Sequence, residues 1–173
     1  MNEIPSGERC IQLLRDVGCS EEVVCHCKAV RDVAVRIAQK AGARVDLVEA
    51  GALLHDIGRA KTNSIRHAIE GVKIAKKLGL SQEIIDIIER HIGAGISIDV
   101  ARSLGLPKKE YIPLTLEEKI VCHADNLLDD STRQPIEQEI EKALSLGHKD
   151  YAVRLARLHW ELSKLCGMDL NKI

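Results

Sequence analysis

The stretch Leu53-Leu54-His55-Asp56-Ile57-Gly58 places a histidine and an aspartate side by side at the end of an apolar segment. A polar run, 59–64, follows the glycine, so the pair closes a buried helix that begins near Asp46. Ionisable side chains at such a position are partly buried, and a buried ionisable group is costly unless it has a partner. The His55-Asp56 pair therefore implies partner residues elsewhere in the chain.

Three further ionisable residues fall on the apolar faces of expected helices. His26, His91 and Asp125 each lie three or four residues from branched apolar residues of their own segment. Residues at that spacing share one face of a helix. His123 lies about 200° around the helix from Asp125 and must face elsewhere, so we assign it, with His148 and His159, to surfaces or packing.

Inward faces of four different helices are thus expected to carry five ionisable side chains: His26, His55, Asp56, His91 and Asp125. Each of them alone is more often a packing, capping or surface residue. Together they need a common partner, and water would be a poor one. A shared divalent cation would satisfy them all, because neutral imidazole and carboxylate are good metal ligands.

The chain reads as helices throughout, and no stretch alternates apolar and polar residues for long enough to predict a strand. Ser20 before Glu21 and Glu22, and Thr115 with Glu118 three residues later, are signals for helix starts. The expected helices cover about 6–18, 20–42, 46–55, 67–78, 81–91, 98–104, 115–128, 136–146 and 150–166. An all-α fold is predicted.

The composition of the 173 residues sets limits on function. With 45% hydrophobic and 29% charged residues, the chain suits one globular domain. A net charge of −1, with one Trp, two Tyr and no Phe, argues against a nucleic-acid partner. With no signal-peptide pattern or membrane-spanning run, we expect a cytoplasmic protein with no membrane partner and reduced thiols. Cys25 and Cys27 are interpreted as small core residues.

In this pattern the chain resembles the HD-domain superfamily of metal-dependent phosphohydrolases. The resemblance rests on His26, on the string His55-Asp56-Ile57-Gly58, and on Asp125 within Ala124-Asp125-Asn126. The length is similar to that of small uncharacterised HD proteins of archaeal type. The resemblance implies an HD-domain helical bundle at 20–130, with an N-terminal helix at 1–19 and a C-terminal helical extension at 131–173 packing on the same domain.

The resemblance also implies a set of metal ligands. A first divalent ion would be held by His26, His55, Asp56 and Asp125. A second would be held by His67 and His91, with Asp56 bridging. The ion could be Mn, Fe, Ni, Co, Mg or Zn. Binuclear members often have a second histidine directly after the residue that matches His91, where this chain has Ile92, so the second ion is expected to have few protein ligands.

The reaction implied is hydrolysis of a phosphomonoester or phosphodiester, in a nucleotide or other small phosphate ester, by a metal-activated hydroxide. Catalytic roles go to Asp56, as a ligand, and to Arg59, which would grip the phosphate. Lys61 and Arg66 are further candidates for substrate binding. The stretch Tyr111-Ile112-Pro113 departs from the Gly-Tyr-Pro signature of cyclic-dinucleotide enzymes and argues against cyclic-di-GMP. We expect the Tyr111 ring to pack at the surface.

Other functions remain open for the same residues. An HD-fold di-iron oxygenase would use the same ligand types, and ligand type alone does not fix the metal or its redox role. A non-catalytic nucleotide-binding signalling domain would bind without turnover, although every motif position is filled here. A plain helical bundle would leave many buried groups unpaired. The Ile-rich helix at 81–91 could belong to the core or to a homodimer interface.

Overall fold

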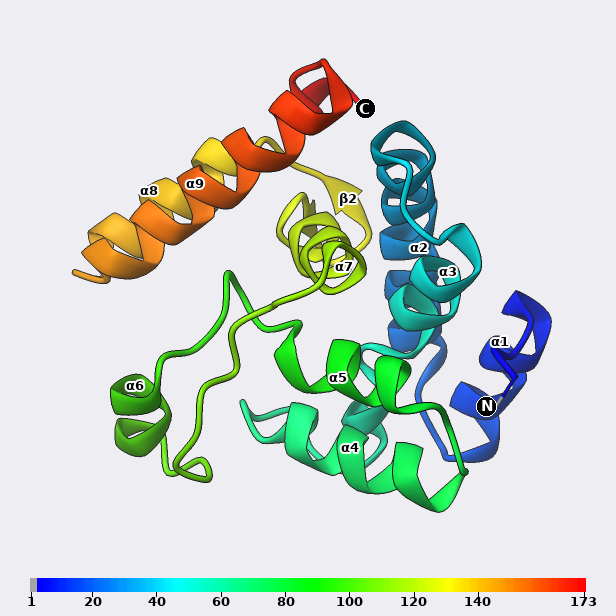
Figure 1. The fold of residues 1–173 in the computed structure, drawn as a ribbon. Coiled ribbons are helices and arrows are strands. Elements are labelled where there is room, and N and C mark those ends of the chain that lie inside the picture. Colours follow the sequence, from blue (N-terminus) through cyan, green and yellow to red (C-terminus); the bar gives the residue numbers. More distant parts are fainter. Residues whose placement is uncertain (1–2) are drawn as a thin grey trace.

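The structure, a computed structural model, describes residues 3–173 and is built almost entirely of helices (Figure 1). The α-helices are α1 (Gly7–Asp16), α2 (Glu21–Ala41), α3 (Val45–Leu54), α4 (His67–Lys77), α5 (Gln82–Arg90), α6 (Ile98–Ser103), α7 (Leu116–Asn126), α8 (Ile136–Ser145) and α9 (Lys149–Cys166). The 3-10 helices are η1 (Ile57–Ala60) and η2 (Leu170–Lys172), and the short strands β1 (Leu128–Asp129) and β2 (Thr132–Arg133) form a hairpin. The predicted all-α fold is confirmed.

The helix boundaries follow the signals in the sequence. The Ser20 side chain accepts a hydrogen bond from the Val23 N–H at the start of α2, and the helix ends at Gly42, whose φ is 71°. The Thr115 side chain accepts from the Glu118 N–H at the start of α7. The local sequence therefore sets where α2 and α7 begin, and so fixes which of their residues face inward.

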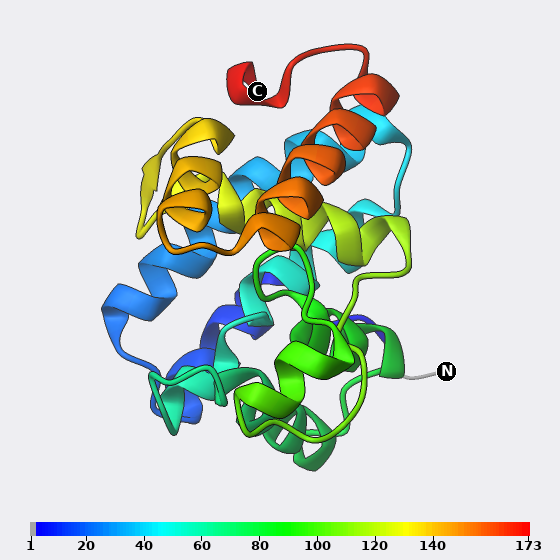
Figure 2. The ribbon, with the colours of Figure 1, turned by 90° about the vertical axis from the view of Figure 1, so that its left-hand side faces the viewer.

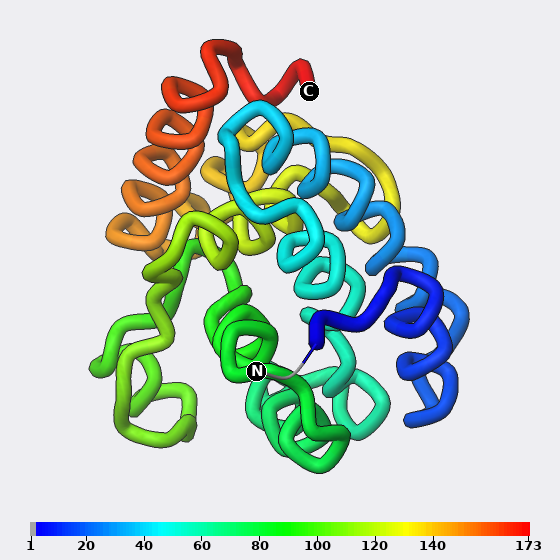
Figure 3. Tube along the Cα trace, turned by 45° about the vertical axis from the view of Figure 1, so that its right-hand side comes forward, coloured from blue at the N-terminus to red at the C-terminus, as the bar shows by residue number. Residues whose placement is uncertain are grey.

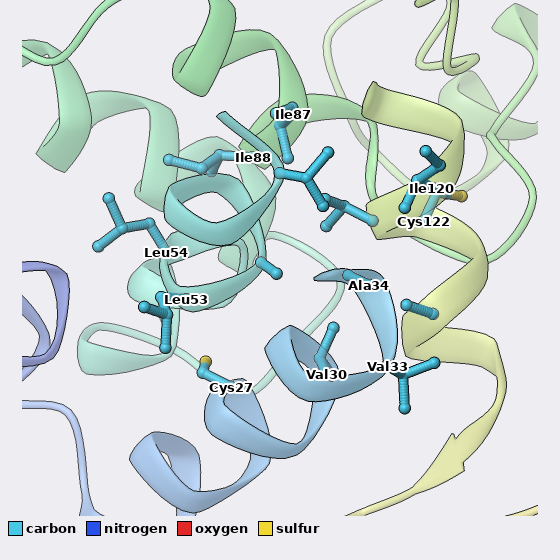
Figure 4. Close-up of a cluster of buried hydrophobic side chains, with 14 of the residues drawn as sticks. Cys27, Val30, Val33, Ala34, Leu53, Leu54, Ile87, Ile88, Ile120 and Cys122 are labelled. Carbon is cyan, nitrogen blue, oxygen red and sulfur yellow. The ribbon is translucent and has the colours of Figure 1, made fainter. Parts of the chain in front are cut away.

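Four helices, α2, α3, α5 and α7, form the centre of the molecule (Figure 4). Apolar side chains from all four meet there, among them Cys27, Val30, Leu53, Leu54, Ile87, Ile88 and Ile120. Gly51 allows α3 to approach α5 closely, since a Cβ at this position would lie 2.6 Å from the Ile87 side chain. Because α3 is buried among its neighbours, its C-terminal end lies inside the protein.

The two ends of the chain pack on this centre from different sides. Helix α1 contacts α3 and α2, whereas α8 and α9 form a helical hairpin that α9 attaches to α2 and α7 (Figures 2 and 3). Leu155, Leu158 and Leu162 are the buried apolar residues of this attachment. The hairpin therefore covers the end of the molecule opposite α4 and forms part of the surroundings of α7.

A second, smaller apolar cluster lies beside α6. It contains Ile96, Ala101, Leu106 and Tyr111, and a β-bridge joins Ile96 to Tyr111. The expectation that Tyr111 packs at the surface was wrong: its side chain is buried, and its hydroxyl donates to the Pro107 carbonyl at 3.1 Å. This cluster ties the loop after α5 to the loop before α7.

Of the two cysteines predicted to be core residues, only one is buried. Cys27 is fully buried in the core, as expected, but Cys25 is exposed, because it lies on the outer face of α2. All six cysteines are free thiols. Within residues 3–173 no helix is long and apolar enough to cross a membrane.

Candidate metal centre

Six ionisable side chains from five helices, or from the residues directly after them, form one cluster. They are His26 of α2, His55 and Asp56 at the end of α3, His67 at the start of α4, His91 after the end of α5, and Asp125 of α7. His26 Nε2 lies 3.1 Å from Asp125 Oδ1, and His67 Nε2 lies 3.1 Å from Asp56 Oδ1. The structure thus brings together the six residues that the sequence and the resemblance selected.

Each of the four histidine rings is oriented by the backbone. The Nδ1 atoms of His55, His67 and His91 lie 2.7, 2.8 and 2.8 Å from carbonyl oxygens three residues earlier, and the Nδ1 of His26 contacts the Asp130 carbonyl. A carbonyl oxygen can only accept, so in the neutral rings these Nδ1 atoms carry the proton and donate. The Nε2 atoms of those rings then present lone pairs to the centre, which is the arrangement of metal-binding histidines.

These lone pairs have no adequate partner within the protein. The Nε2 atoms of His67 and His91 lie 3.0 Å apart, although each ring already donates through Nδ1. His55 Nε2 and Asp56 Oδ1 are buried without a hydrogen-bond partner. Buried polar atoms are rarely left in this state. The nitrogen and oxygen donors therefore fit a divalent cation that takes lone pairs from several sides.

Two sets of donor atoms are compact enough to hold a metal ion. One consists of His26, His55 and Asp125, and the other of His55, Asp56 and His91, and within each set the donor atoms lie within 4.8 Å of one another. His55 and Asp56 are almost completely buried, whereas the side chains of His26 and Asp125 are 18% and 25% exposed. The cluster is closed on one side and reachable from the other.

In the protein without metal, three residues of the cluster have pKa values shifted from their usual range. Burial opposes a charge on His26, but the hydrogen bond and charge of Asp125 outweigh it and raise the pKa of His26 to about 9. Burial lowers the pKa of His55 to about 4. Burial also acts to raise the pKa of Asp56, but the nearby histidines prevail and hold it well below its usual range. Asp56 is thus charged and His55 is neutral, as metal ligands must be, whereas His26 holds a proton near neutral pH that a bound metal ion would displace.

Gly58 explains why the His-Asp-Ile string ends in glycine. A Cβ on this residue would lie 1.8 Å from the carbonyl oxygen of His67 and 2.5 Å from the backbone nitrogen of Gly71. The backbone of η1 is therefore pressed against the first turns of α4. This contact sets His67 beside Asp56, and no side chain fits between the two segments.

Two supports of the cluster were not found from the sequence. The β1–β2 hairpin places the Asp130 carbonyl against His26, and Asp130 has a left-handed φ of 50°. The buried Glu118 accepts two hydrogen bonds from Arg90, at 2.9 and 3.0 Å, which holds the residue before His91 against α7. The capping signal at Glu118 pointed to a helix start and not to this pairing, and two-residue strands leave no periodic pattern to detect.

The three basic residues expected to bind substrate lie in different surroundings. Arg59 donates through Nε to Asp56 Oδ2, and its side chain is 33% exposed. Lys61 is exposed, and Arg66 donates to the Gly105 carbonyl at 2.9 Å. Only Arg59 of the three lines the hollows beside the cluster.

Two hollows meet at Arg59 and Asp125. The first, of about 880 Å³, is lined by the start of α2, by the ligand candidates His26, Asp56 and Asp125, and by the β1–β2 turn. The second, of about 940 Å³, is lined by the loop after His91, by α6 and by the α8–α9 hairpin. Ile92, at the place of the second histidine of many binuclear members, belongs to the wall of this second hollow.

Two relatives match almost the whole of this chain. The tRNA (cytidine(56)-2'-O)-methyltransferase of Thermoplasma volcanium is 43% identical over 170 residues, which are 98% of this chain but 50% of that protein. An uncharacterized protein of Methanocaldococcus jannaschii is 44% identical over 166 residues, covering 91% of this chain and 97% of its own. The chain thus spans half the length of the methyltransferase.

Solved structures and a family model complete the comparison. The HD domain of the L. monocytogenes phosphodiesterase PgpH shares the fold, with a TM-score of 0.56 and 19% identity over 90% of this chain and 97% of that one. That domain has also been solved in complex with cyclic-di-AMP. The model of the HD domain matches residues 23–130, which include all six residues of the cluster. The chain belongs to the HD domain family.

Proposed function

We propose that this chain is a metal-dependent phosphohydrolase that cleaves a phosphomonoester or phosphodiester bond of a nucleotide or other small phosphate ester. The observation that carries the proposal is the convergence of four imidazole Nε2 atoms on two carboxylates, with every Nδ1 held by a backbone carbonyl. The phosphodiesterase named among the structures of the same fold supports the reaction type.

The two oxygens of Asp56 support a two-metal assignment. Oδ2 lies 3.8 Å from the Nε2 atoms of both His26 and His55, whereas Oδ1 lies 3.1 and 3.5 Å from those of His67 and His91. Each carboxylate oxygen thus serves one pair of histidines. We assign the first ion to His26, His55, Asp56 and Asp125, and the second to His67, His91 and Asp56. Ile92 adds no donor, so the second ion has three protein ligands.

The residues around the cluster suit hydrolysis of a phosphate ester. When bound, divalent ions polarise a phosphoryl oxygen and lower the pKa of water. The backbone carbonyls keep the histidine rings in the binding orientation. Arg59 lies at the meeting point of both hollows, where its guanidinium can bind phosphate oxygens in a bidentate manner and offset their charge. Asp125 and His26 form the exposed side from which a substrate can enter.

The methyltransferase name of one relative belongs to a protein twice as long as the matched region. Methyl transfer does not call for a cluster of buried histidines and carboxylates with inward lone pairs, whereas phosphate ester hydrolysis does. We therefore assign hydrolysis, and not methyl transfer, to the region that this chain shares with that relative.

The test is turnover by protein depleted of metal and then supplied with Mn²⁺, Co²⁺, Ni²⁺ or Mg²⁺. Substrates are nucleoside monophosphates, cyclic nucleotides, dinucleotides and bis(p-nitrophenyl) phosphate. We expect metal-dependent release of phosphate or alcohol, lost in His55→Ala and Asp56→Ala and retained in Asp16→Asn, a carboxylate change on the exposed face of α1. Undiminished turnover in both cluster variants would contradict the proposal. The proposal would also be contradicted if the protein bound iron tightly, catalysed an oxygen-dependent oxidation and showed no hydrolysis.

A further inference from the structure

The two hollows that meet at the metal centre differ in charge. Beyond the ligand candidates, the first hollow is lined by Glu21, Glu22 and Asp130, and Arg59 is the cation among its lining residues. The second is lined by three further cations, Lys142, Lys149 and Arg154, and by two further anions, Glu139 and Asp150, all from the α8–α9 hairpin, which leaves an excess of positive charge. An anionic group that extends away from the centre is therefore repelled by the first hollow and attracted by the second.

The cations of the second hollow are only partly compensated. Glu139 faces Lys142 at 3.8 Å and accepts from the Tyr151 hydroxyl at 3.4 Å, so its charge is already shared. Lys149 and Arg154 make no ion pair within residues 3–173. Arg154 donates through one terminal nitrogen to the Gly95 carbonyl at 3.2 Å, while its buried Nε has no hydrogen-bond partner. This leaves donor capacity for a ligand.

The opposite wall of the second hollow is apolar. It is formed by Ile65, Ile92 and Ile96 with Val100 and Leu104 of α6, and the last two are 42% and 44% exposed. In Figures 1 and 2, α6 lies below the α8–α9 hairpin on the same side of the molecule. An apolar wall facing a cationic one suits a flat heterocycle attached to a phosphate. The volume of about 940 Å³ lies within the range of small-molecule sites.

We propose that the second hollow binds the nucleoside of the substrate together with a second phosphate group, so that the substrate class is nucleotides carrying two phosphates. The scissile phosphate lies at the metal cluster, the nucleoside lies against Ile92 and Val100, and the second phosphate lies between Lys142, Lys149 and Arg154. The placement of the scissile phosphate rests on the proposed hydrolase function. The C-terminal hairpin, outside the region that the HD model matches, then determines specificity.

The test uses adenosine 3′,5′-bisphosphate and adenosine 5′-monophosphate as probes. Their binding to the metal-depleted full chain is measured by calorimetry, and KM is measured with Mn²⁺. In the wild type we expect the bisphosphate to bind at least about 10-fold more tightly, the effect of roughly one added charge-assisted contact. The double change Lys142→Glu and Lys149→Glu, both at exposed positions, should abolish this preference. Lys76→Glu with Lys77→Glu, an equal charge change on exposed residues of α4, should preserve it.

The outcomes separate this inference from the proposed function. Equal affinity for the two probes, or an unchanged preference in the Lys142 and Lys149 double variant, overturns the inference, even where Mn²⁺-dependent hydrolysis persists. A clear preference for the bisphosphate without any turnover supports the second hollow as a binding site and contradicts the hydrolase proposal. A higher KM for the bisphosphate alone in the double variant, at unchanged kcat, supports both.

Discussion

The protein contains two groups of buried histidines, and they solve the problem of burial differently. At the candidate metal centre, four rings donate through Nδ1 to carbonyls and leave their Nε2 atoms facing one another. Between α7 and α9, His123 Nε2 lies 3.0 Å from His159 Nδ1, and His159 Nε2 lies 3.1 Å from Asp169 Oδ1. The second group forms a chain in which each N–H has an acceptor, and the Nδ1 atom of His123 is its one buried nitrogen without a partner.

The difference shows what distinguishes a metal site from a structural histidine pair. In the His123–His159–Asp169 chain a neutral His123 donates to His159, which donates to a carboxylate, so no cation is needed. Burial lowers the pKa of His123 to about 3 and keeps the ring neutral. In the cluster the Nδ1 atoms donate to backbone carbonyls, so the Nε2 atoms of the neutral rings His55, His67 and His91 have only lone pairs to offer. Convergence of lone pairs, and not the number of histidines, therefore identifies the site.

Replacing one histidine in each group gives the largest contrast in activity. Loss of an outer partner of a metal ligand costs roughly 10–100-fold in activity. We expect His55→Ala to lower kcat/KM by more than that, because His55 is itself a ligand assigned to the first ion and its ring is fully buried in the cluster. His159→Ala should leave kcat/KM within about twofold, since the partners of its ring nitrogens are His123 and Asp169, neither of which belongs to the cluster. Steady-state kinetics with Mn²⁺ checks both. A similar loss in both variants would mean that the two groups do not differ in function.

Gly58→Ala should cause the largest loss of stability. The added methyl group would overlap the His67 carbonyl at 1.8 Å, so η1 and α4 must separate. We expect a loss of about 3 kcal/mol or more in the free energy of unfolding, as for severe overpacking, together with weaker metal binding. Urea denaturation and a metal titration measure the two effects. Gly7→Ala is the comparison for the loss of a glycine without a clash against the backbone, since the three atoms nearest to its added Cβ are side-chain atoms of Glu49 and Leu53, the nearest at 3.0 Å.

His159→Ala should destabilise the protein without affecting the metal site. It leaves the Nε2–H of fully buried His123 without its acceptor, which costs about 1–3 kcal/mol. Thermal unfolding measured with and without Mn²⁺ should give the same metal-induced stabilisation as in the wild type. If Mn²⁺ no longer stabilised this variant, the two histidine groups would have to be coupled.

Asp130→Gly is expected to have the smallest effect. The contact with His26 uses the backbone carbonyl of Asp130, and glycine adopts the φ of 50° readily. We expect a change in stability within about 0.5 kcal/mol and nearly normal Mn²⁺ affinity. Asp130→Pro, which cannot adopt a positive φ, should weaken Mn²⁺ binding by releasing His26. Equal Mn²⁺ affinities in the two variants would show that the hairpin does not orient His26.

Much of the fold was predictable because it depends on local signals. Caps such as Ser20 and Thr115, and apolar residues three and four apart, identified the helices and their inward faces. The cluster followed from five residues on those faces: His26, His55, Asp56, His91 and Asp125. His67 came from the resemblance alone, because it starts a helix after a polar loop and has no stripe to place it.

The remaining features depend on contacts between distant segments. The assignment of His123 and His159 to surfaces or packing did not foresee that His123 is fully buried and joined to Asp169 through His159. The Arg90–Glu118 pair and the approach of Gly58 to His67 join residues on different helices. No periodic pattern records which helix ends meet, and so the sequence could name the ligand candidates without their supports.

The most direct test is a titration of the metal-depleted protein with Mn²⁺, monitored by calorimetry and by electron paramagnetic resonance. For the wild type we expect one tightly bound ion per chain and, at most, a second ion that binds more weakly. His55→Ala should lose the tight ion, His67→Ala should lose only the weaker one, and His159→Ala should bind as the wild type does. A wild-type protein that binds no Mn²⁺, Co²⁺ or Fe²⁺, or a His55→Ala variant that binds them normally, would contradict the metal-site assignment.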